Sequence, residues 1–262
     1  MIRLIHGDCL EEMANLAEDG VKVDLTVTSP PYDNLRTYED SLEWGESIWK
    51  KAISILYDLT VEGGVVVWIV GDATINGSET GTSFKQVLWA KKCGFNLHDT
   101  MIWNKGGFSA VGALSTRYAP VFEYMFVWVK GKISTFNPIK DRKTKHGGER
   151  ASGTIRQSDG STKPMSKVMI INEYSQRFNI WKQSPQRQRG KSHPAPFPEK
   201  LANDHIISWS NEHDIVFDPF MGSGTTGVAC KKLKRNFIGI EKEKKYFDMA
   251  EKRIDSVQMV LG

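Results

Sequence analysis

The chain has 262 residues, of which 40% are hydrophobic and 25% charged, with a formal net charge of +4, and this composition excludes a disordered or fibrous protein. No apolar run exceeds the six residues from Val65 to Val70, and the N-terminus lacks a secretion signal, so we expect neither membrane contact nor export. The three cysteines form no C-x-x-C pair, which predicts no metal site, and their small number fits the reducing cytoplasm.

Residues 1–130 alternate apolar segments with amphipathic ones, a pattern typical of a doubly wound α/β sheet. Apolar runs predict strands at 2–5, 24–28, 65–70, 97–103 and 123–129, and helical spacing predicts helices from about residue 9, at 47–59 and at 82–92. Asp8 is placed to cap the first of these helices. The second strand stops at Thr28-Ser29-Pro30-Pro31-Tyr32, because two consecutive prolines continue neither a strand nor a helix.

Residues 131–192 break this rhythm and carry an excess of positive charge. They contain 14 Lys and Arg but only four Asp and Glu, a net charge of +10, which leaves −6 for the other 200 residues. This asymmetry fits a segment that meets a polyanion. A solvated surface insertion explains the charge equally well.

Alternation resumes in residues 193–262, where helices are predicted at 198–209, 227–233 and 244–254 and strands at 214–217 and 236–240. The first of these strands runs into Asp218-Pro219-Phe220-Met221-Gly222-Ser223-Gly224-Thr225-Thr226, whose glycines let a ligand approach the backbone. Glu241 ends the next strand, where an acid is placed to bind ribose hydroxyls. A P-loop is excluded because threonine replaces its lysine, while an NAD site stays open on these residues alone.

The segment after the second strand presents groups that suit a planar amine. Ser29 offers a hydroxyl, Pro30 a carbonyl oxygen and Tyr32 an aromatic face, which together supply two acceptors and a stacking surface. On spacing alone, a rigid edge loop is the simpler interpretation.

Taken together, the two motifs resemble those of the amino-methylating DNA methyltransferases that use S-adenosylmethionine. The S-P-P-Y motif precedes F-x-G-x-G by about 190 residues, as in the circularly permuted β class, whereas related glutamine and RNA methyltransferases carry the cofactor motif first. Three further segments are similar to family segments: His6-Gly7-Asp8-Cys9, His193-Pro194-Ala195-Pro196-Phe197-Pro198, and Trp103-Asn104-Lys105 with Arg117-Tyr118 and Glu123.

The resemblance implies a circularly permuted, Rossmann-like class I methyltransferase sheet with an inserted basic target-recognition segment. Its catalytic half is expected at residues 1–130, the insertion at 131–192 and the cofactor-binding half at 193–262. Double-stranded DNA is the implied partner, gripped by the insertion, with the target base flipped out of the stack.

The resemblance also assigns roles to single residues. Tyr32 stacks on the flipped base, while Ser29 and the Pro30 carbonyl, in a motif completed by Pro31, accept hydrogen bonds from its exocyclic amine. The implied cofactor residues are Asp8 at the adenine, Glu241 at the ribose, Asp218 at the methionine amino group, Thr225 at its carboxylate, and Cys9, His193, Pro194, Phe220, Gly222 and Gly224 around them. Bland alternatives are a helix cap for Asp8, a core residue for Phe220, a surface acid for Glu241 and a packing residue for His193.

The target base is cytosine or adenine. Serine before Pro-Pro is typical of cytosine-N4 enzymes, so Ser29 favours cytosine-N4, although residues 218–247 look equally like adenine-N6 members. Carbon-5 methylation needs a cysteine preceded by proline, and Cys9, Cys93 and Cys230 all follow other residues.

Two alternatives to a DNA methyltransferase are an RNA methyltransferase and a DNA-binding module without activity. The second explains the basic segment but not the intact S-P-P-Y and glycine motifs. The resemblance leaves open a homodimer and a companion restriction endonuclease, and the recognition sequence is not readable from residues 131–192.

Overall fold

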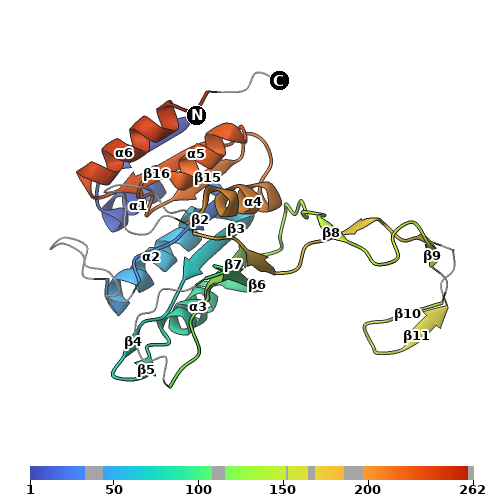
Figure 1. The fold of residues 1–262 in the computed structure, drawn as a ribbon. Helices are drawn as coiled ribbons and strands as arrows, with labels where there is room; N and C mark the ends of the chain where they lie inside the picture. Colours follow the sequence, from blue (N-terminus) through green and yellow to red (C-terminus); the bar gives the residue numbers. More distant parts are fainter. Residues whose placement is uncertain (33–43, 108–115, 152, 165–168, 186–196, 259–262) are drawn as a thin grey trace. The chain divides into compact units, whose positions relative to one another are not determined.

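The computed structural model describes residues 1–32, 44–107, 116–151, 153–164, 169–185 and 197–258 (Figure 1). It divides into two compact units. The first combines Met1–Asn137 with Asn179–Gly262, and the second is Pro138–Phe178.

The first unit is built on an eight-stranded sheet. Within this sheet only β7 runs antiparallel to its neighbours, β3 and β6, and the remaining pairs are parallel. The strand order is β1 (Ile2–His6), β16 (Asn236–Glu241), β15 (Ile215–Asp218), β2 (Val23–Thr28), β3 (Thr60–Val70), β7 (Phe122–Lys130), β6 (Phe95–Asn104) and β14 (Ile180–Lys182).

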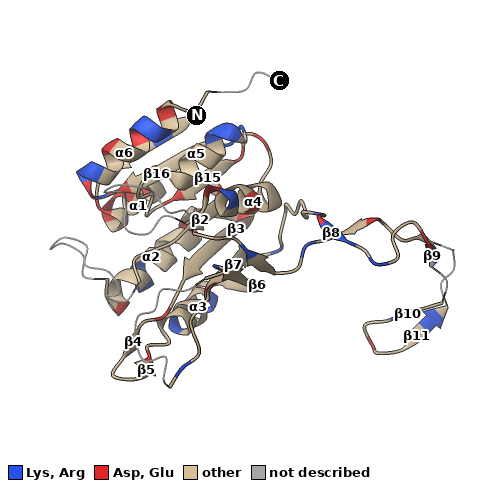
Figure 2. Ribbon diagram, in the orientation of Figure 1, with Lys and Arg blue, Asp and Glu red and all other residues tan. Residues whose placement is uncertain are grey.

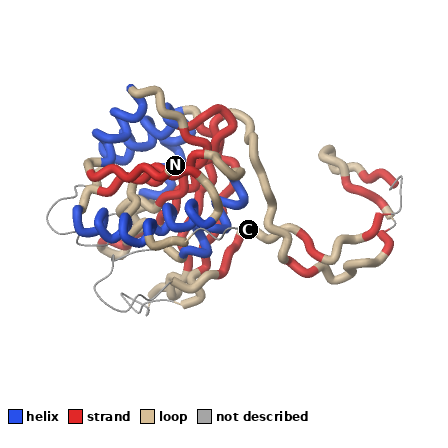
Figure 3. Tube along the Cα trace, turned by 90° about the horizontal axis from the view of Figure 1, so that it is seen from above, coloured by secondary structure: helices blue, strands red, loops and turns tan. Residues whose placement is uncertain are grey.

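Helices cover both faces of this sheet (Figures 1 and 3). One group contains α1 (Cys9–Glu18), α2 (Glu46–Leu59) and α3 (Thr82–Cys93), and the other contains α4 (Glu199–Trp209), α5 (Thr225–Lys232) and α6 (Lys244–Asp255). Successive residues of β3 enter opposite cores: Val67 packs with the α4–α6 side and Trp68 with the α1–α3 side. Burial on both faces explains why this strand reads as an unbroken apolar run. The predicted doubly wound α/β sheet is confirmed.

Most predicted elements are present with small shifts at their ends. Asp8 caps α1 as predicted, since its Oδ1 accepts a hydrogen bond from the Leu10 N–H at 3.0 Å. Helix α5 starts at Thr225, two residues before the predicted 227, because Gly224 already serves as its N-cap. Strand β3 starts at Thr60 rather than at residue 65. A short hairpin of β4 (Thr74–Ile75) and β5 (Ser78–Glu79) follows it.

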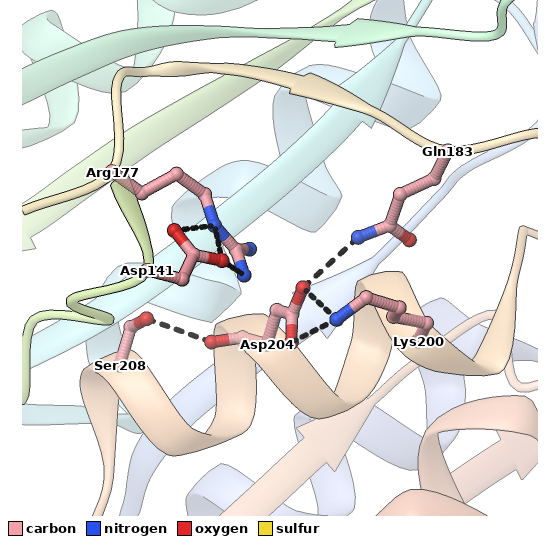
Figure 4. Close-up of polar contacts among 6 residues, drawn as sticks. All are labelled: Asp141, Arg177, Gln183, Lys200, Asp204 and Ser208. Atoms are coloured by element: carbon pink, nitrogen blue, oxygen red, sulfur yellow. Dashed lines mark hydrogen bonds and ion pairs between the residues drawn. The ribbon is translucent and has the colours of Figure 1, made fainter. Parts of the chain in front are cut away.

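Strand β14 lies within residues 131–192, yet it pairs in parallel with β6 at the edge of the main sheet. The residue that follows it, Gln183, donates to the Asp204 carboxylate of α4 at 2.9 Å, and Lys200 lies 3.1 Å from the same carboxylate (Figure 4). The Gln183 hydrogen bond joins the end of β14 to α4, while the Lys200 ion pair lies within that helix.

The second unit is a nested set of short antiparallel ladders. They pair β8 (Arg142–Lys143) with β13 (Tyr174–Ser175), β9 (Arg150–Ala151) with β12 (Met169–Ile170), and β10 (Thr154–Arg156) with β11 (Thr162–Pro164). At its base the Arg177 guanidinium donates to the Asp141 carboxylate, with Nε 2.9 Å from Oδ2 (Figure 4). In the sequence, residues 138–178 include nine Lys and Arg against four Asp and Glu. Figure 2 shows Lys and Arg in blue near β8 and on the β10–β11 hairpin. No described helix of the chain has the length and apolarity needed to cross a membrane.

Candidate active site at the carboxyl edge of the sheet

The predicted site residues that the structure describes lie near one edge of the sheet. Strands β1, β16, β15 and β2 are parallel neighbours, so their carboxyl ends lie at one edge of the sheet. Asp218 and Glu241 end β15 and β16, while Asp8 and Ser29 follow β1 and β2. This edge is where ligands bind in open α/β sheets. The two motifs, about 190 residues apart in sequence, therefore become neighbours.

Asp218 joins these two motifs through its side chain. Its Oδ1 accepts hydrogen bonds from Thr28 Oγ1 at 2.7 Å and from the Phe220 N–H at 3.1 Å. Its Oδ2 accepts from Thr226 Oγ1 at 2.8 Å. The side chain is only 1% exposed, and burial raises the pKa of its carboxyl to about 6, against the effect of the three hydrogen bonds. The carboxylate thus faces protein donors, and its predicted contact with the cofactor amino group stays a prediction.

The glycine loop between β15 and α5 has a conformation that requires glycine. Gly222 has φ +53° and Gly224 φ +79°, both in the left-handed region. A Cβ on Gly224 would also lie 2.9 Å from the Ala250 Cβ of α6, so α6 packs directly on this glycine. As the N-cap of α5, Gly224 has no side chain to accept from the first N–H groups of the helix, which leaves the amino end suited to an anionic group.

Glu241 holds the same loop from the next strand. Its Oε2 accepts from the Gly222 N–H and its Oε1 from the Glu243 N–H, both at 2.8 Å. Burial raises the pKa of this carboxyl above its ordinary value. Each oxygen retains a further lone pair for a hydroxyl donor. At the end of β1, the Asp8 Oδ2 lies 3.4 Å from the Lys242 Nζ, while Oδ1 caps α1.

Two other predicted cofactor residues lie among core side chains. Phe220 is half-buried and packs edge-on against Trp44 and Trp68, with ring centroids 5.2 and 6.2 Å away. Cys9 is half-buried, and desolvation raises the pKa of its thiol to about 12, so the thiol is protonated at neutral pH. Burial likewise raises the pKa of Cys230. His193 and Pro194 lie outside the described residues.

The S-P-P-Y motif is tied to a polar network that sequence analysis did not foresee. Ser29 Oγ lies 3.1 Å from the Tyr32 hydroxyl, which donates to Glu123 Oε2 at 2.7 Å. Lys105 Nζ donates to Glu123 Oε1 at 3.1 Å. In the sequence, Lys105 and Glu123 stand out only as members of a segment similar to one of the family. The pairing of β6 with β7 brings these two residues together, because it places Trp103, two residues before Lys105, opposite Glu123.

The described residues therefore provide, at one edge, a glycine loop before a helix, an acid on the next strand and a hydroxyl beside a tyrosine. The family model described as DNA methylase, for N6 and N4 methyltransferases, matches residues 23–252. The chain belongs to this DNA methylase family.

Relatives of this DNA methylase include the orphan methyltransferase M.BamHII of Bacillus amyloliquefaciens, which is 49% identical and aligned over 88% of each chain. The DNA adenine methyltransferase YhdJ of Escherichia coli K12 is 30% identical over 96% of this chain and 82% of its own. The crystal structure of the M1.HpyAVI–SAM complex matches with TM-score 0.67 and 26% identity, over 97% of this chain and all of that one. The cytosine-N4-specific PvuII DNA methyltransferase matches in fold, with TM-score 0.69 and 18% identity over the whole of this chain and 88% of its own.

These findings confirm the predicted amino-methyltransferase family and its cofactor, S-adenosylmethionine. The residues at this edge of the sheet fit that cofactor chemically. The amino end of α5 suits a carboxylate, and the remaining lone pairs of Glu241 suit ribose hydroxyls. In the described part of the chain, no three His, Cys, Asp or Glu side chains gather as metal ligands.

The burial of Asp218 predicts a specific pH dependence of stability. Because folding raises its pKa from 3.8 to about 6, the folded state holds this proton between those values while the unfolded state releases it. The stabilising effect of protonation is therefore present below pH 4 and lost as pH rises through 6, by about 3 kcal/mol. Asp218→Asn removes this titration while keeping one acceptor oxygen.

The measurement is urea denaturation of wild type and Asp218→Asn from pH 4.5 to pH 7. We expect the stability of the wild type relative to the variant to fall as pH rises. Asp58→Asn, at an exposed acid, is the control and should show no such trend. A wild-type-to-variant difference that is constant or rises with pH would contradict the buried, proton-holding carboxyl.

Proposed function

We propose that the protein methylates N4 of cytosine in double-stranded DNA at a specific site, with S-adenosylmethionine as donor. The observation that carries this is the Ser29 hydroxyl at the end of β2, 3.1 Å from the Tyr32 hydroxyl and one strand away from the glycine loop of β15. A hydroxyl there is the acceptor typical of cytosine-N4 members of the family.

When bound, S-adenosylmethionine supplies a methyl group already activated by its sulfonium. The chain's task is then to present the amine. Ser29 Oγ and the Pro30 carbonyl accept its two N–H bonds, and the Tyr32 ring stacks on the base. Both acceptors draw the nitrogen lone pair out of conjugation with the ring, and positioning and electrostatics supply most of the rate. The amine loses a proton after transfer, so no strong base is needed.

The cofactor is held by the loop that Asp218 and Glu241 fasten. Glu241 binds the ribose, Asp8 the adenine amine, and the amino end of α5 with Thr225 the carboxylate of the methionine part. Gly222 and Gly224 let that part approach the backbone, and Phe220 with its aromatic neighbours forms the wall behind it. Cys9, His193, Pro194 and the Asp218 carboxylate remain predicted members of this site.

The DNA contact is assigned to the basic second unit. Its β10–β11 hairpin carries Arg156 and Lys163, both exposed. The turn between them is braced by Asp159, whose Oδ1 accepts from the Ser161 N–H at 2.9 Å. A braced hairpin with cationic side chains suits the phosphate backbone of a duplex. A homodimer and a companion endonuclease stay predictions.

Adenine-N6 is the second candidate base. YhdJ is a DNA adenine methyltransferase by name, and this chain is 30% identical to it over most of its length. Both bases present an exocyclic amine beside a ring nitrogen, so a serine acceptor serves either chemically. An RNA methyltransferase or a DNA-binding module without activity explains less of the structure, since neither accounts for the joined S-P-P-Y and glycine loops.

Mass spectrometry of nucleosides from DNA treated with the protein and S-adenosylmethionine tests the proposal. We expect N4-methylcytosine in duplex DNA and none in RNA added as a competitor. N6-methyladenine would overturn the choice of base while keeping the enzyme class. Neither product, on DNAs of several sequences, would contradict the proposed activity.

Glu241→Gln tests the ribose contact. Glutamine keeps the shape but replaces one oxygen by a donor, which opposes either the Gly222 or the Glu243 N–H. Loss of a charged hydrogen bond predicts cofactor affinity weaker by roughly tenfold or more, with DNA affinity unchanged. Calorimetric titration of both proteins measures this, with Glu251→Gln, at an exposed acid of α6, as control. Equal cofactor affinity in wild type and Glu241→Gln would remove Glu241 from the site.

Arg156→Ala and Lys163→Ala test the DNA contact of the second unit. Each phosphate contact removed lowers the slope of log affinity against log salt by about 0.9. We expect each variant to bind duplex DNA more weakly and with a shallower salt slope, and to bind the cofactor normally. Fluorescence anisotropy over a salt series measures this, with exposed Lys91→Ala of α3 as control. An unchanged slope in both variants would place the DNA elsewhere.

A further inference from the structure

Four side chains form one polar chain beside the S-P-P-Y motif. It runs from Lys105 Nζ to Glu123 Oε1 at 3.1 Å, from Glu123 Oε2 to the Tyr32 hydroxyl at 2.7 Å, and from there to Ser29 Oγ at 3.1 Å. The four residues come from the ends of β6, β7 and β2. Lys105 and Glu123 have no role in the activity proposed above.

The chemistry of these groups orders the protons along the chain. An ammonium only donates and a carboxylate only accepts, so Lys105 and Tyr32 both donate to Glu123. The tyrosine hydroxyl has a single proton, and its oxygen is left to accept. The one hydrogen bond compatible with this order between Tyr32 and Ser29 is donated by the Ser29 hydroxyl. Its proton is thereby directed to Tyr32, and its lone pairs are left for another donor.

This order matters because a hydroxyl, unlike a carboxylate, has two opposite uses. A Ser29 proton directed at the target nitrogen would bind the lone pair that must attack the methyl group. A Ser29 proton directed at Tyr32 leaves the oxygen to accept an N–H of the amine, which has the opposite effect on that lone pair. A serine in this position therefore needs its proton held elsewhere.

We propose that Glu123 is the positioning residue that sets Ser29 as a hydrogen-bond acceptor, acting through the Tyr32 hydroxyl. Glu123 is only 9% exposed, and hydrogen bonds in a poorly solvated environment are stronger than in water. Lys105 balances its charge. The inference rests on the proposed role of Ser29 as acceptor for the amine.

A double-mutant cycle separates this relay from a general structural effect. Glu123→Gln keeps the side-chain shape, and Tyr32→Phe keeps the stacking ring but removes the hydroxyl that lies between Glu123 and Ser29. We expect each single variant to lower the single-turnover rate constant for methylation by roughly tenfold, with cofactor affinity within twofold of wild type. The double variant should be no slower than Tyr32→Phe alone, because the relay is already cut.

The cycle is measured as single-turnover methylation with saturating S-adenosylmethionine and duplex DNA, alongside thermal melting of each variant. Glu79→Gln is the matched control, because Glu79 is an exposed acid at the same end of the sheet, 3.4 Å from Arg117 Nη1. Glu123→Asp, which retains a carboxylate, is expected to recover part of the lost rate. It serves as the second variant if Glu123→Gln melts at a lower temperature than wild type.

Multiplied losses in the double variant, or a Glu123→Gln enzyme as fast as wild type, would overturn the relay. These outcomes are distinct from failure of the proposed function. If wild type methylates no DNA, the function itself fails, whereas an active wild type with multiplied losses refutes the relay alone.

Discussion

The buried carboxylate of Asp218 is the contact on which the rest of the site depends. It receives one hydroxyl from the last residue of β2, another from the first turn of α5 and the N–H of Phe220. Burying a carboxylate is unfavourable, and three hydrogen bonds offset the cost only while all three donors keep their places. Together with the pairing of β15 with β2, this one side chain therefore sets the position of the S-P-P-Y motif relative to the glycine loop.

Glu241, on the neighbouring strand β16, fixes the same loop in a similar way. It accepts from Gly222, two residues after the N–H that Asp218 binds, so two acids on neighbouring strands hold alternate backbone amides of one loop. An irregular loop of glycines loses much conformational entropy when it is ordered. The hydrogen bonds to these fixed acceptors and the packing of α6 on Gly224 offset that loss of entropy. A binding loop ordered in this way demands little rearrangement from an incoming ligand.

The features that the sequence predicted well are those that depend on local patterns of residues. The apolar run of β3 and the helical spacing of α2 each identified an element to within a few residues, and Asp8 was recognised as a cap. Strand β14 was missed because it has only three residues, two of them exposed, and its pairing with β6 is not local. The partner of Asp218, 190 residues away, and that of Tyr32, 91 residues away, depend on strand order, which periodicity does not encode.

The end of strand β2 is fixed by two acidic residues, one on β15 and one on β7. Thr28 is fixed by Asp218, while Ser29 and Tyr32 are connected to Glu123, and two prolines between them remove backbone freedom. In the proposed reaction the groups that face the base are thus oriented before it arrives, which is the condition under which fixed dipoles lower a barrier. Since cytosine and adenine both present an amine beside a ring nitrogen, such orientation favours the reaction without choosing the base. In the proposed reaction the space beside the Tyr32 ring adds to Ser29 in setting which base fits, because a Cβ on Gly71 would lie 3.7 Å from that ring and 3.6 Å from the Glu123 Cγ.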